Sequence, residues 1–440
     1  MPRTRLLPLM IAAAALLAAP AQAQLRLPGG LGSLPGVPAV TAPLQAPSRL
    51  PELVPGDVPL QSLRRRAVDS LLTRQAAQVE ADPAGEPVRR GELIVLSPTA
   101  ALLAAAQAQG FRVLREQRFE PLDLRGVVLA PPAGLSTREG LERLRALDPS
   151  VEVDYQHLYT RSGELGPGRA ASAPGPDAPA SRRVGLIDGG IDRAHPALRA
   201  AQVQVSGCDG VPAPSPHGTA IASLLVGRDA AFAGMLAGRT TLYAADVYCG
   251  LEAGGSVESV VQAMAWMARE QVAVINVSLV GAPNRLLERA VLALAERGHL
   301  VVAAVGNDGP NAPPLYPAAY AQVVGVTAVA PSRRVLPEAA RGPHVAFAAP
   351  GSELAVAQAG STSYAVARGT SFAAPFVAGL LADELPTPDA AAARRALARV
   401  AERATDLGEP GRDPVFGWGL VGEQARNAPS RVQAMRRGRP

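Results

Sequence analysis

Four residues that lie far apart in the 440-residue sequence are of the types that nucleophilic serine catalysis requires. A serine hydroxyl needs a base to take its proton, a carboxylate to hold that base, and donors for the charge that develops on the attacked carbonyl oxygen. Asp188 closes the stretch VGLID, His217 stands in PHGT, Asn307 ends VVAAVGN, and Ser371 stands in GTSFAAP. If Ser371 opens a helix, its backbone N–H is free to serve as a second donor. These groups together are what acyl transfer by a serine would use.

The composition excludes several other chemistries. All 43 residues counted as Lys or Arg are arginine, so the sequence has no Schiff-base lysine, Ser–Lys dyad or P-loop lysine. It has five histidines and two cysteines, a supply that a four-ligand zinc site would largely consume, and it has no CxxC or HxxxH spacing. We therefore expect an enzyme that works with serine, histidine and carboxylates and that needs no cofactor or metal for its chemistry.

The elements that must position these residues alternate regularly after residue 181. Nearly continuous apolar runs are typical of strands buried on both faces, and helical periodicity separates them. The alternation predicts a doubly wound, mostly parallel α/β domain over residues 182–426. Ligands bind such sheets beyond the carboxyl ends of the strands, where Asp188 and Asn307 stand. The predicted strands are 184–188, 241–248, 272–279, 300–307 and 323–329, and the predicted helices include 218–226, 257–270 and 285–297.

A smaller unit precedes this domain. Residues 89–160 predict the order β-α-β-β-α-β of a ferredoxin-like arrangement and carry no catalytic constellation. Residues 161–181, rich in Gly, Ala, Ser and Pro, predict a linker. The remaining segments are a Pro/Gly-rich leader with a short Arg-rich helix from Leu60 to Val79 (24–88) and a basic tail (427–440).

The first 23 residues predict a signal peptide. Arg3 and Arg5 form its charged end, residues 6–19 its apolar stretch, and Ala21-Gln22-Ala23 its cleavage site. The alternative is an uncleaved membrane anchor, although the apolar stretch is shorter than a membrane span. We expect export to the periplasm or medium, with no membrane span in the remaining chain. The mild net charge gives no reason to expect a nucleic-acid partner.

Export also bears on the two cysteines. In an oxidising compartment a lone pair of cysteines is most simply one disulfide, and Cys208 and Cys249 each follow a strand-like segment. Two free buried thiols are the alternative.

The sequence resembles the subtilisin-like (S8) serine peptidases. The order Asp, His, Ser is that of subtilisin. The motifs IDGGID, HGT, VINVSL with AAVGN, and GTSFAAPFVAG agree in order and surroundings, and residues 404–421 resemble the segment that closes the family's domain. The resemblance implies that Asp188 orients His217, that His217 is general base and then acid, that Ser371 attacks, and that Asn307 donates to the oxyanion.

The resemblance also implies a substrate cleft and a precursor. Two segments resemble the edges that pair with the backbone of a protein or peptide substrate. The unit at 89–160 resembles the family's I9-like propeptide, which assists folding and acts as an intramolecular inhibitor until its removal. We expect self-cleavage between about Leu158 and Arg183. The residues of the two edges are Ser278, Leu279, Val280 and Gly281 in one segment, and Gly254, Gly255 and Ser256 in the other.

Several positions depart from the family's pattern. Gly189 stands where Ser or Thr is usual, and Val280 stands where Gly is typical. Ala197 replaces a carboxylate at the family's usual calcium site, which argues against a structural calcium there. Asp308 follows the oxyanion asparagine and suggests a preference for basic residues in the first pocket. A catalytically silent subtilisin-fold protein that binds peptides or a partner is the alternative function, although such a role places no demand on an intact triad and Asn307.

Overall fold

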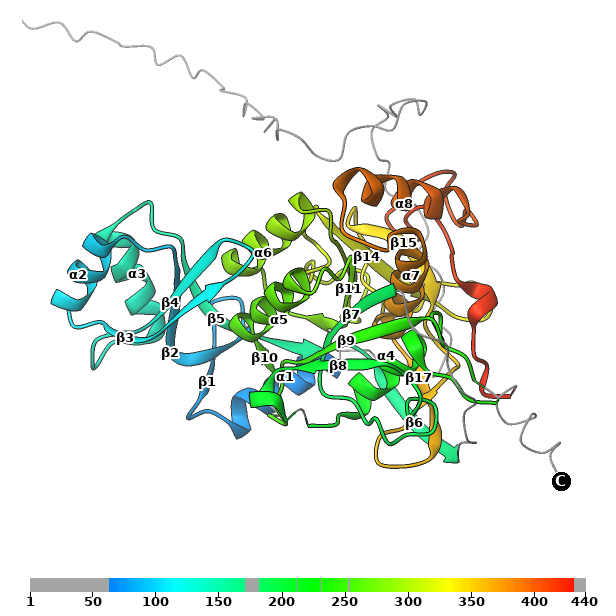
Figure 1. Cartoon of the computed structure of the whole chain (residues 1–440). Coiled ribbons are helices and arrows are strands. Elements are labelled where there is room, and N and C mark those ends of the chain that lie inside the picture. Colours follow the sequence, from blue (N-terminus) through cyan, green and yellow to red (C-terminus); the bar gives the residue numbers. More distant parts are fainter. Residues whose placement is uncertain (1–62, 171–181, 212, 231, 252–253, 431–440) are drawn as a thin grey trace, which may run out of the picture. The chain divides into compact units, whose positions relative to one another are not determined.

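The computed structural model describes residues 63–170 and 182–430, except 212, 231, 252 and 253 (Figure 1). All of these residues belong to one compact unit, residues 53–440. The predicted signal peptide, most of the leader and the end of the basic tail lie outside the described residues. Within the described part of the chain, no helix is long and apolar enough to span a membrane.

The larger domain is built on a parallel sheet of seven strands, as the alternating pattern predicts. The strand order changes direction between β7 and β11, so the carboxyl end of β7 lies at the switch point where such sheets bind ligands. In spatial order the strands are β15 (Val345–Pro350), β14 (Val323–Val329), β13 (Leu300–Ala304), β11 (Val274–Val277), β7 (Arg182–Asp188), β9 (Thr240–Asp246) and β8 (Val203–Ser206).

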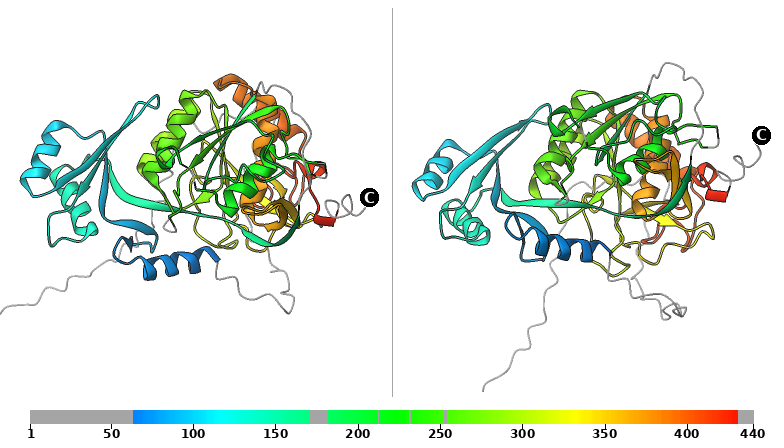
Figure 2. Two further views of the ribbon diagram at one scale, coloured as in Figure 1. Left: turned by 60° about the horizontal axis from the view of Figure 1, so that its bottom comes forward. Right: turned by 90° about the horizontal axis from the view of Figure 1, so that it is seen from below.

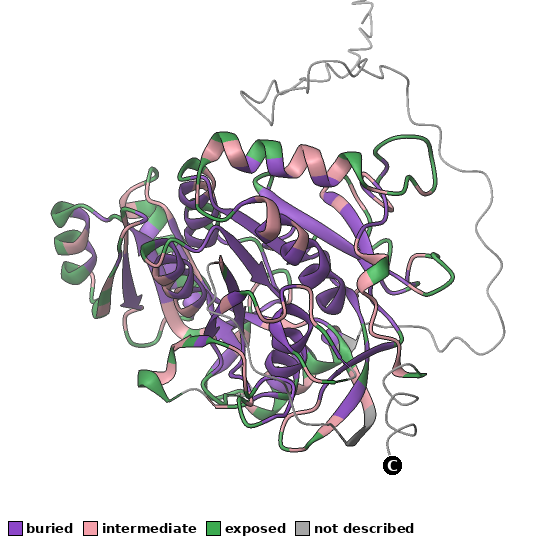
Figure 3. Ribbon diagram, turned by 45° about the vertical axis from the view of Figure 1, so that its right-hand side comes forward, coloured by how far each residue is buried: buried purple, intermediate pink, exposed green. Residues whose placement is uncertain are grey.

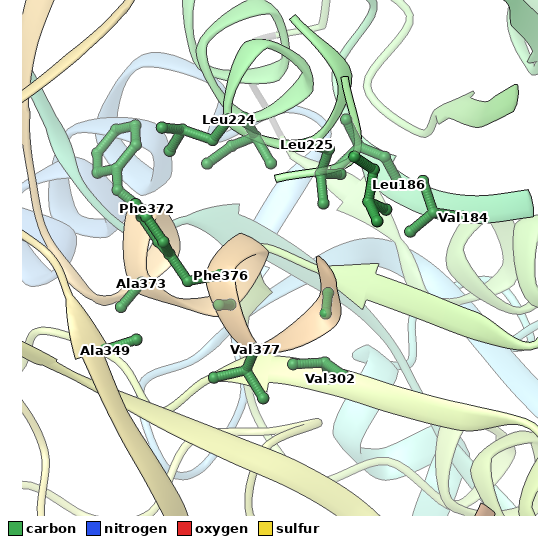
Figure 4. Packing of buried hydrophobic residues seen from close by; sticks show 14 of the residues in the cluster. Val184, Leu186, Leu224, Leu225, Val302, Ala349, Phe372, Ala373, Phe376 and Val377 are labelled. Atoms are coloured by element: carbon green, nitrogen blue, oxygen red, sulfur yellow. The ribbon is translucent and has the colours of Figure 1, made fainter. Parts of the chain in front are cut away.

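Helices cover both faces of this sheet because its strands are apolar on both sides (Figure 3). One face packs against α4 (Pro216–Val226), α7 (Thr370–Glu384) and α8 (Ala390–Glu402), and Figure 4 shows Phe372, Phe376 and Leu186 in that core. The opposite face packs against α5 (Val257–Arg269) and α6 (Arg285–Glu296). Two short 3₁₀ helices complete the described helices (Cys208–Gly210 and Glu423–Ala425).

The smaller unit has the predicted order β-α-β-β-α-β. Its antiparallel strands pair in the order β5-β2-β4-β3, with β1 beside β2. Helices α2 and α3 cover one face, and the other face shares a core with α5 and α6 of the larger domain. Ser136 and Glu139 form a capping box at the start of α3. The elements are β1 (Val79–Ala81), β2 (Pro87–Leu96), α2 (Ala100–Ala108), β3 (Arg112–Phe119), β4 (Leu124–Ala130), α3 (Thr137–Leu147) and β5 (Val153–Arg161).

Two predictions for the connecting segments are wrong in part. The Arg-rich helix α1 spans Leu63–Arg74 and does not reach Val79, which begins β1. The predicted linker contains a strand, β6 (Glu164–Ala170), which pairs with β17 (Ser363–Arg368), itself paired with β16 (Leu354–Ala357). Gly and Pro are unfavourable inside a central strand, but Pro is tolerated in an edge strand, and β6 lies at the edge of this three-stranded sheet. Figure 2 follows the continuous segment from β5 to β6, in blue-green.

Candidate active site

Asp188 and His217 form a buried pair. Asp188 is the last residue of β7, and its Oδ2 lies 2.8 Å from Nδ1 of His217. His217 stands in the first turn of α4, where Ser215 caps the helix by accepting a hydrogen bond from the N–H of Gly218 at 2.9 Å. The N–H of Gly189 donates to the other carboxylate oxygen of Asp188 at 2.7 Å. The carboxylate therefore holds the imidazole with Nε2 directed away from it, free to act as a base.

Ser371 lies in the first turn of α7, which packs against α4. Its hydroxyl and Nε2 of His217 are both buried, and neither has a hydrogen-bond partner among the described residues. Pro375 has no N–H to donate to the Ser371 carbonyl, and this carbonyl instead accepts a hydrogen bond from the Ser278 hydroxyl at 3.3 Å. In a structure without substrate, catalytic groups often lack their final hydrogen bonds. The unpaired hydroxyl and imidazole nitrogen are the two atoms that a serine mechanism would bring together.

Asn307 is held by hydrogen bonds at both ends of its side-chain amide. It follows β13, and its Oδ1 accepts a hydrogen bond from the N–H of Thr370 at 3.0 Å. Its Nδ2 donates to the hydroxyl of Ser162 at 2.8 Å. The start of α7 thus orients the amide of Asn307, and its donor is directed toward a segment of the chain itself.

That segment is the end of β5, which runs between the two predicted substrate edges. β10 (Gly255–Ser256) pairs with it on one side at Tyr159 and Leu158, and β12 (Leu279–Val280) pairs with it on the other at Arg161 and Thr160, both antiparallel. The structure brings six of the seven predicted substrate-binding residues against residues 158–161 of the same chain, and the seventh, Ser278, bonds to the carbonyl of Ser371.

The Tyr159 side chain fills a closed space between the two edges. Its ring is fully buried, and its hydroxyl donates to the carbonyl of Ala282 at 2.7 Å. A Cβ atom at Gly281 would lie 2.7 Å from this ring, and a Cβ atom at Gly254 would lie 2.6 Å from the Tyr159 carbonyl oxygen. Burial raises the pKa of the Tyr159 phenol well above its usual value, so it remains a neutral donor. Both glycines are needed for the chain to approach this closely.

Beyond Ser162 the chain continues past the start of α7. A Cβ atom at Gly163 would lie 2.6 Å from the ring of Phe372, and one at Gly369 would lie 2.7 Å from the Cα of Gly163. The next residue, Glu164, pairs with Arg368 at the start of the β6–β17 ladder. The backbone between Ser162 and Glu164 therefore crosses the site beside Asn307 and the start of α7.

One contact beside this site could not be predicted from the sequence. Arg64 of α1 forms an ion pair with Asp308 at 3.1 Å and is also bonded to Glu86. Asp308 was predicted to favour basic residues in the first pocket, and in the structure its basic partner comes from the chain's own helix. Nothing in the local pattern around Arg64 distinguishes it from the neighbouring Arg65 and Arg66.

The structure joins Cys208 and Cys249 by the predicted disulfide, with their Cα atoms 5.1 Å apart. Among the described residues, no group of three or more His, Cys, Asp or Glu side chains is placed to hold a metal ion. Ala197, at the position of the family's usual calcium-site carboxylate, is buried and apolar. Ala197 therefore supplies no side-chain oxygen to a calcium ion at that position.

Residues 181–419, more than half of the chain, match the model of the subtilase family, Peptidase_S8. The minor extracellular protease Epr of Bacillus subtilis (strain 168) is 33% identical over 181 residues, which are 41% of this chain and 28% of that protein. The alkaline protease of Alkalihalobacillus alcalophilus is 29% identical over 350 residues, which are 76% of this chain and 86% of that protein.

A solved structure has the same fold. Fervidolysin from Fervidobacterium pennivorans, described as a keratinolytic enzyme related to subtilisin, matches with a TM-score of 0.60 and 18% identity. The match covers 81% of this chain and 62% of that one. This chain thus spans less than a third of Epr and less than two thirds of fervidolysin.

Proposed function

Because this chain belongs to the subtilase family of serine endopeptidases, we propose that it hydrolyses peptide bonds through Ser371, His217 and Asp188, with Asn307 as an oxyanion donor. Catalysis in this family needs no cofactor. We further propose that the chain is exported and made as a precursor that cuts and then inhibits itself. The observation that carries the proposal is the course of residues 158–163, which pass between β10 and β12 and then beside Asn307.

In the proposed reaction, Nε2 of His217 takes the proton of Ser371 as the hydroxyl oxygen attacks the substrate's carbonyl carbon. Asp188 stabilises the resulting imidazolium through the Nδ1–H bond of 2.8 Å. Nδ2 of Asn307 and the backbone N–H of Ser371 donate to the oxyanion. His217 then protonates the leaving amine, and a water molecule hydrolyses the acyl-enzyme by the same steps in reverse.

The bond cut in the precursor is proposed to be Ser162–Gly163. Three observations support this assignment: Ser162 contacts Asn307, Gly163 packs against Phe372 and Gly369, and the residues before Ser162 pair with both edges. The assignment falls within the interval predicted from the sequence, between Leu158 and Arg183. Cleavage there would leave residues 158–162 in the cleft as a bound product.

The smaller unit would hold that product in place. Arg115 on β3 is bonded to Glu258 on α5, and the carboxylate of Asp154 accepts a hydrogen bond from the N–H of Arg285 at 3.0 Å, at the start of α6. The anion at a helix N-terminus and the shared core with α5 and α6 stabilise the docked unit. The alignment with the alkaline protease spans 350 residues and so extends beyond residues 181–419 of this chain. Residues 89–160 are therefore proposed to be an intramolecular inhibitor.

Labelling with an organophosphonate probe, followed by intact mass, tests the proposal. We expect wild-type protein to be labelled and its mature form to begin at Gly163, whereas Ser371→Ala should be unlabelled and uncut at this bond. Absence of labelling in folded, processed protein would overturn the enzymatic proposal. An identical N-terminus in wild type and Ser371→Ala would show that processing is external and overturn self-cleavage alone.

A further inference from the structure

The side chain of Arg161 lies against an aromatic ring beside the catalytic pair. Its guanidinium carbon is 4.4 Å from the centroid of the Tyr248 ring. Tyr248 is 4% exposed, whereas Arg161 is partly exposed. A guanidinium over the face of a shielded aromatic ring is attracted by the negative face of the ring, more strongly than at an open surface. The contact therefore depends on the positive charge of the guanidinium as well as on its planar shape.

The backbone that carries the ring is held by its surroundings. Tyr248 follows β9, and its N–H and that of Cys249 both donate to Oδ1 of Asp246 at 3.0 Å. The disulfide to Cys208 fixes the next residue along the chain. A ring that is buried and carried by a backbone held in this way is a pre-formed surface, so little conformational entropy is lost when a ligand binds to it.

Two carboxylates lie near the ring. Asp188 and Asp246 are opposite each other at the ends of the parallel strands β7 and β9. Oxygens of both accept hydrogen bonds from backbone N–H groups, including that of Ala213 to Oδ2 of Asp246 at 2.9 Å. Their charge favours a cation nearby, while the face of Tyr248 supplies the direct contact.

Gly189 makes room for the guanidinium. A Cβ atom at Gly189 would lie 3.2 Å from Nη2 of Arg161 and 2.5 Å from the Ser215 hydroxyl. A serine or threonine, which is usual at this position in the resembling family, would place further atoms in the same space. Gly189, which departs from the family's usual Ser or Thr, thus leaves space that the side chain of Arg161 occupies.

We infer that Tyr248 and Gly189 form a specificity pocket that selects arginine at the substrate position immediately before the residue whose carbonyl is attacked. The inference rests on the proposed function and on the assignment of Ser162–Gly163 as the bond cut, because that assignment places Arg161 at this position. Arginine is favoured over lysine because its planar guanidinium stacks on the ring. Neither residue takes part in bond making, so the effect is on substrate selection.

Hydrolysis of a peptide series by the purified mature enzyme tests the inference. The peptides copy residues 158–164 and carry arginine, citrulline, leucine or alanine at the position of Arg161. Citrulline has nearly the shape of arginine without its charge. We expect kcat/KM to be higher for the arginine peptide than for the citrulline peptide by about 2-fold to about 30-fold, the range of a cation–π contact from exposed to desolvated sites.

Three variants assign the effect to the two residues. Tyr248→Leu should bring the arginine-to-citrulline ratio close to one, whereas Tyr248→Phe, which keeps the ring, should retain the preference. Gly189→Ser should lower kcat/KM more for the arginine peptide than for the alanine peptide. Phosphonate labelling of each variant verifies that its active site is folded.

The outcomes separate this inference from the proposed function. A labelled wild-type enzyme that cuts the arginine and citrulline peptides equally would overturn the inference alone. An unchanged ratio in Tyr248→Leu would also overturn it. If neither labelling nor hydrolysis of any peptide occurs, the proposed function fails and the inference fails with it.

Discussion

The guanidinium of Arg64 lies 3.1 Å from Oδ2 of Asp308, the residue that follows the proposed oxyanion donor Asn307. The side chains of Arg64 and Asp308 are only 3% and 10% exposed, and Glu86 bonds to the same guanidinium. This cluster ties helix α1, the start of β2 and the loop after β13 together. The leader helix is therefore part of the structure around the cleft, although it precedes the β-α-β-β-α-β unit in the chain.

Replacing Arg64 should destabilise the precursor strongly. In a Ser371→Ala background, which we expect to leave Ser162–Gly163 uncut, Arg64→Met removes one partner of a buried ion cluster and leaves two carboxylates without it. Breaking a buried pair in this way costs roughly 3–5 kcal/mol. Urea denaturation measures the change in the free energy of unfolding. Arg66→Met, at an exposed position of the same helix, should change it by less than about 0.5 kcal/mol. Equal effects of the two substitutions would show that the cluster does not stabilise the precursor.

Removing the proposed oxyanion donor should slow the reaction without preventing binding. We expect Asn307→Ala to lower kcat about 10²- to 10³-fold with a much smaller change in KM, because the donor acts on charge that develops in the transition state. Steady-state hydrolysis of a soluble peptide measures both constants. Asn311→Ala, at an exposed position in the following loop, is the matched control. A rise in KM with kcat unchanged would assign Asn307 to substrate binding instead.

Loss of the disulfide should lower stability. The bridge joins residues 41 apart in sequence, and closing a loop of that size is worth on the order of 4 kcal/mol in the chain-entropy model. We expect the double substitution Cys208→Ser and Cys249→Ser in Ser371→Ala to lower the free energy of unfolding by about this amount. Denaturation curves with and without a reductant provide the comparison. A reductant should then affect the parent but not the double variant.

Stability should fall as the pH falls below about 6.5. Burial lowers the pKa of His299 and of His344, so the unfolded chain takes up protons at these residues before the native protein does. Stability therefore rises with pH through the window between the lowered native pKa and the unfolded pKa of about 6.5, and it is lost as the pH decreases through that window. One histidine contributes at most about 1.4 kcal/mol per pH unit there.

The substitution His299→Gln in Ser371→Ala tests this account. The imidazole of His299 lies 2.7 Å from the carbonyl of Val272, and a glutamine amide also has an N–H to donate to that carbonyl. We expect the variant to show a shallower dependence of the free energy of unfolding on pH between 5 and 6.5. Between pH 8 and 9 its curve should run parallel to that of the parent, since the histidines are neutral in both states. Equal slopes in the acid range would contradict the assignment to His299.

The sequence by itself determined the order of the elements and the residues that end them. Asp188, Asn307 and Ser371 were predicted at strand or helix ends because apolar runs and helical periodicity are local properties, and the structure has those strands and helices with small shifts of their ends. The pairing of Cys208 with Cys249 was predictable because a sequence with two cysteines allows only one bridge within the chain. The pairing of Asp188 with His217 was predicted from the sequence motifs around them and not from hydrophobic periodicity.

The tertiary structure alone decided which distant segments meet. Residues 164–170 have a linker's composition and became a strand only because the edge of β17 offers hydrogen bonds. Arg64 meets Asp308 across 244 positions, and Arg161 meets Tyr248 from a different domain. Such contacts arise when strands and helices pack. Neither the type of a side chain nor its local spacing in the sequence predicts which distant residue it will contact. The same holds for Gly189. The sequence shows only that it differs from the family's usual residue, whereas the structure shows that its missing side chain leaves space for the guanidinium of Arg161.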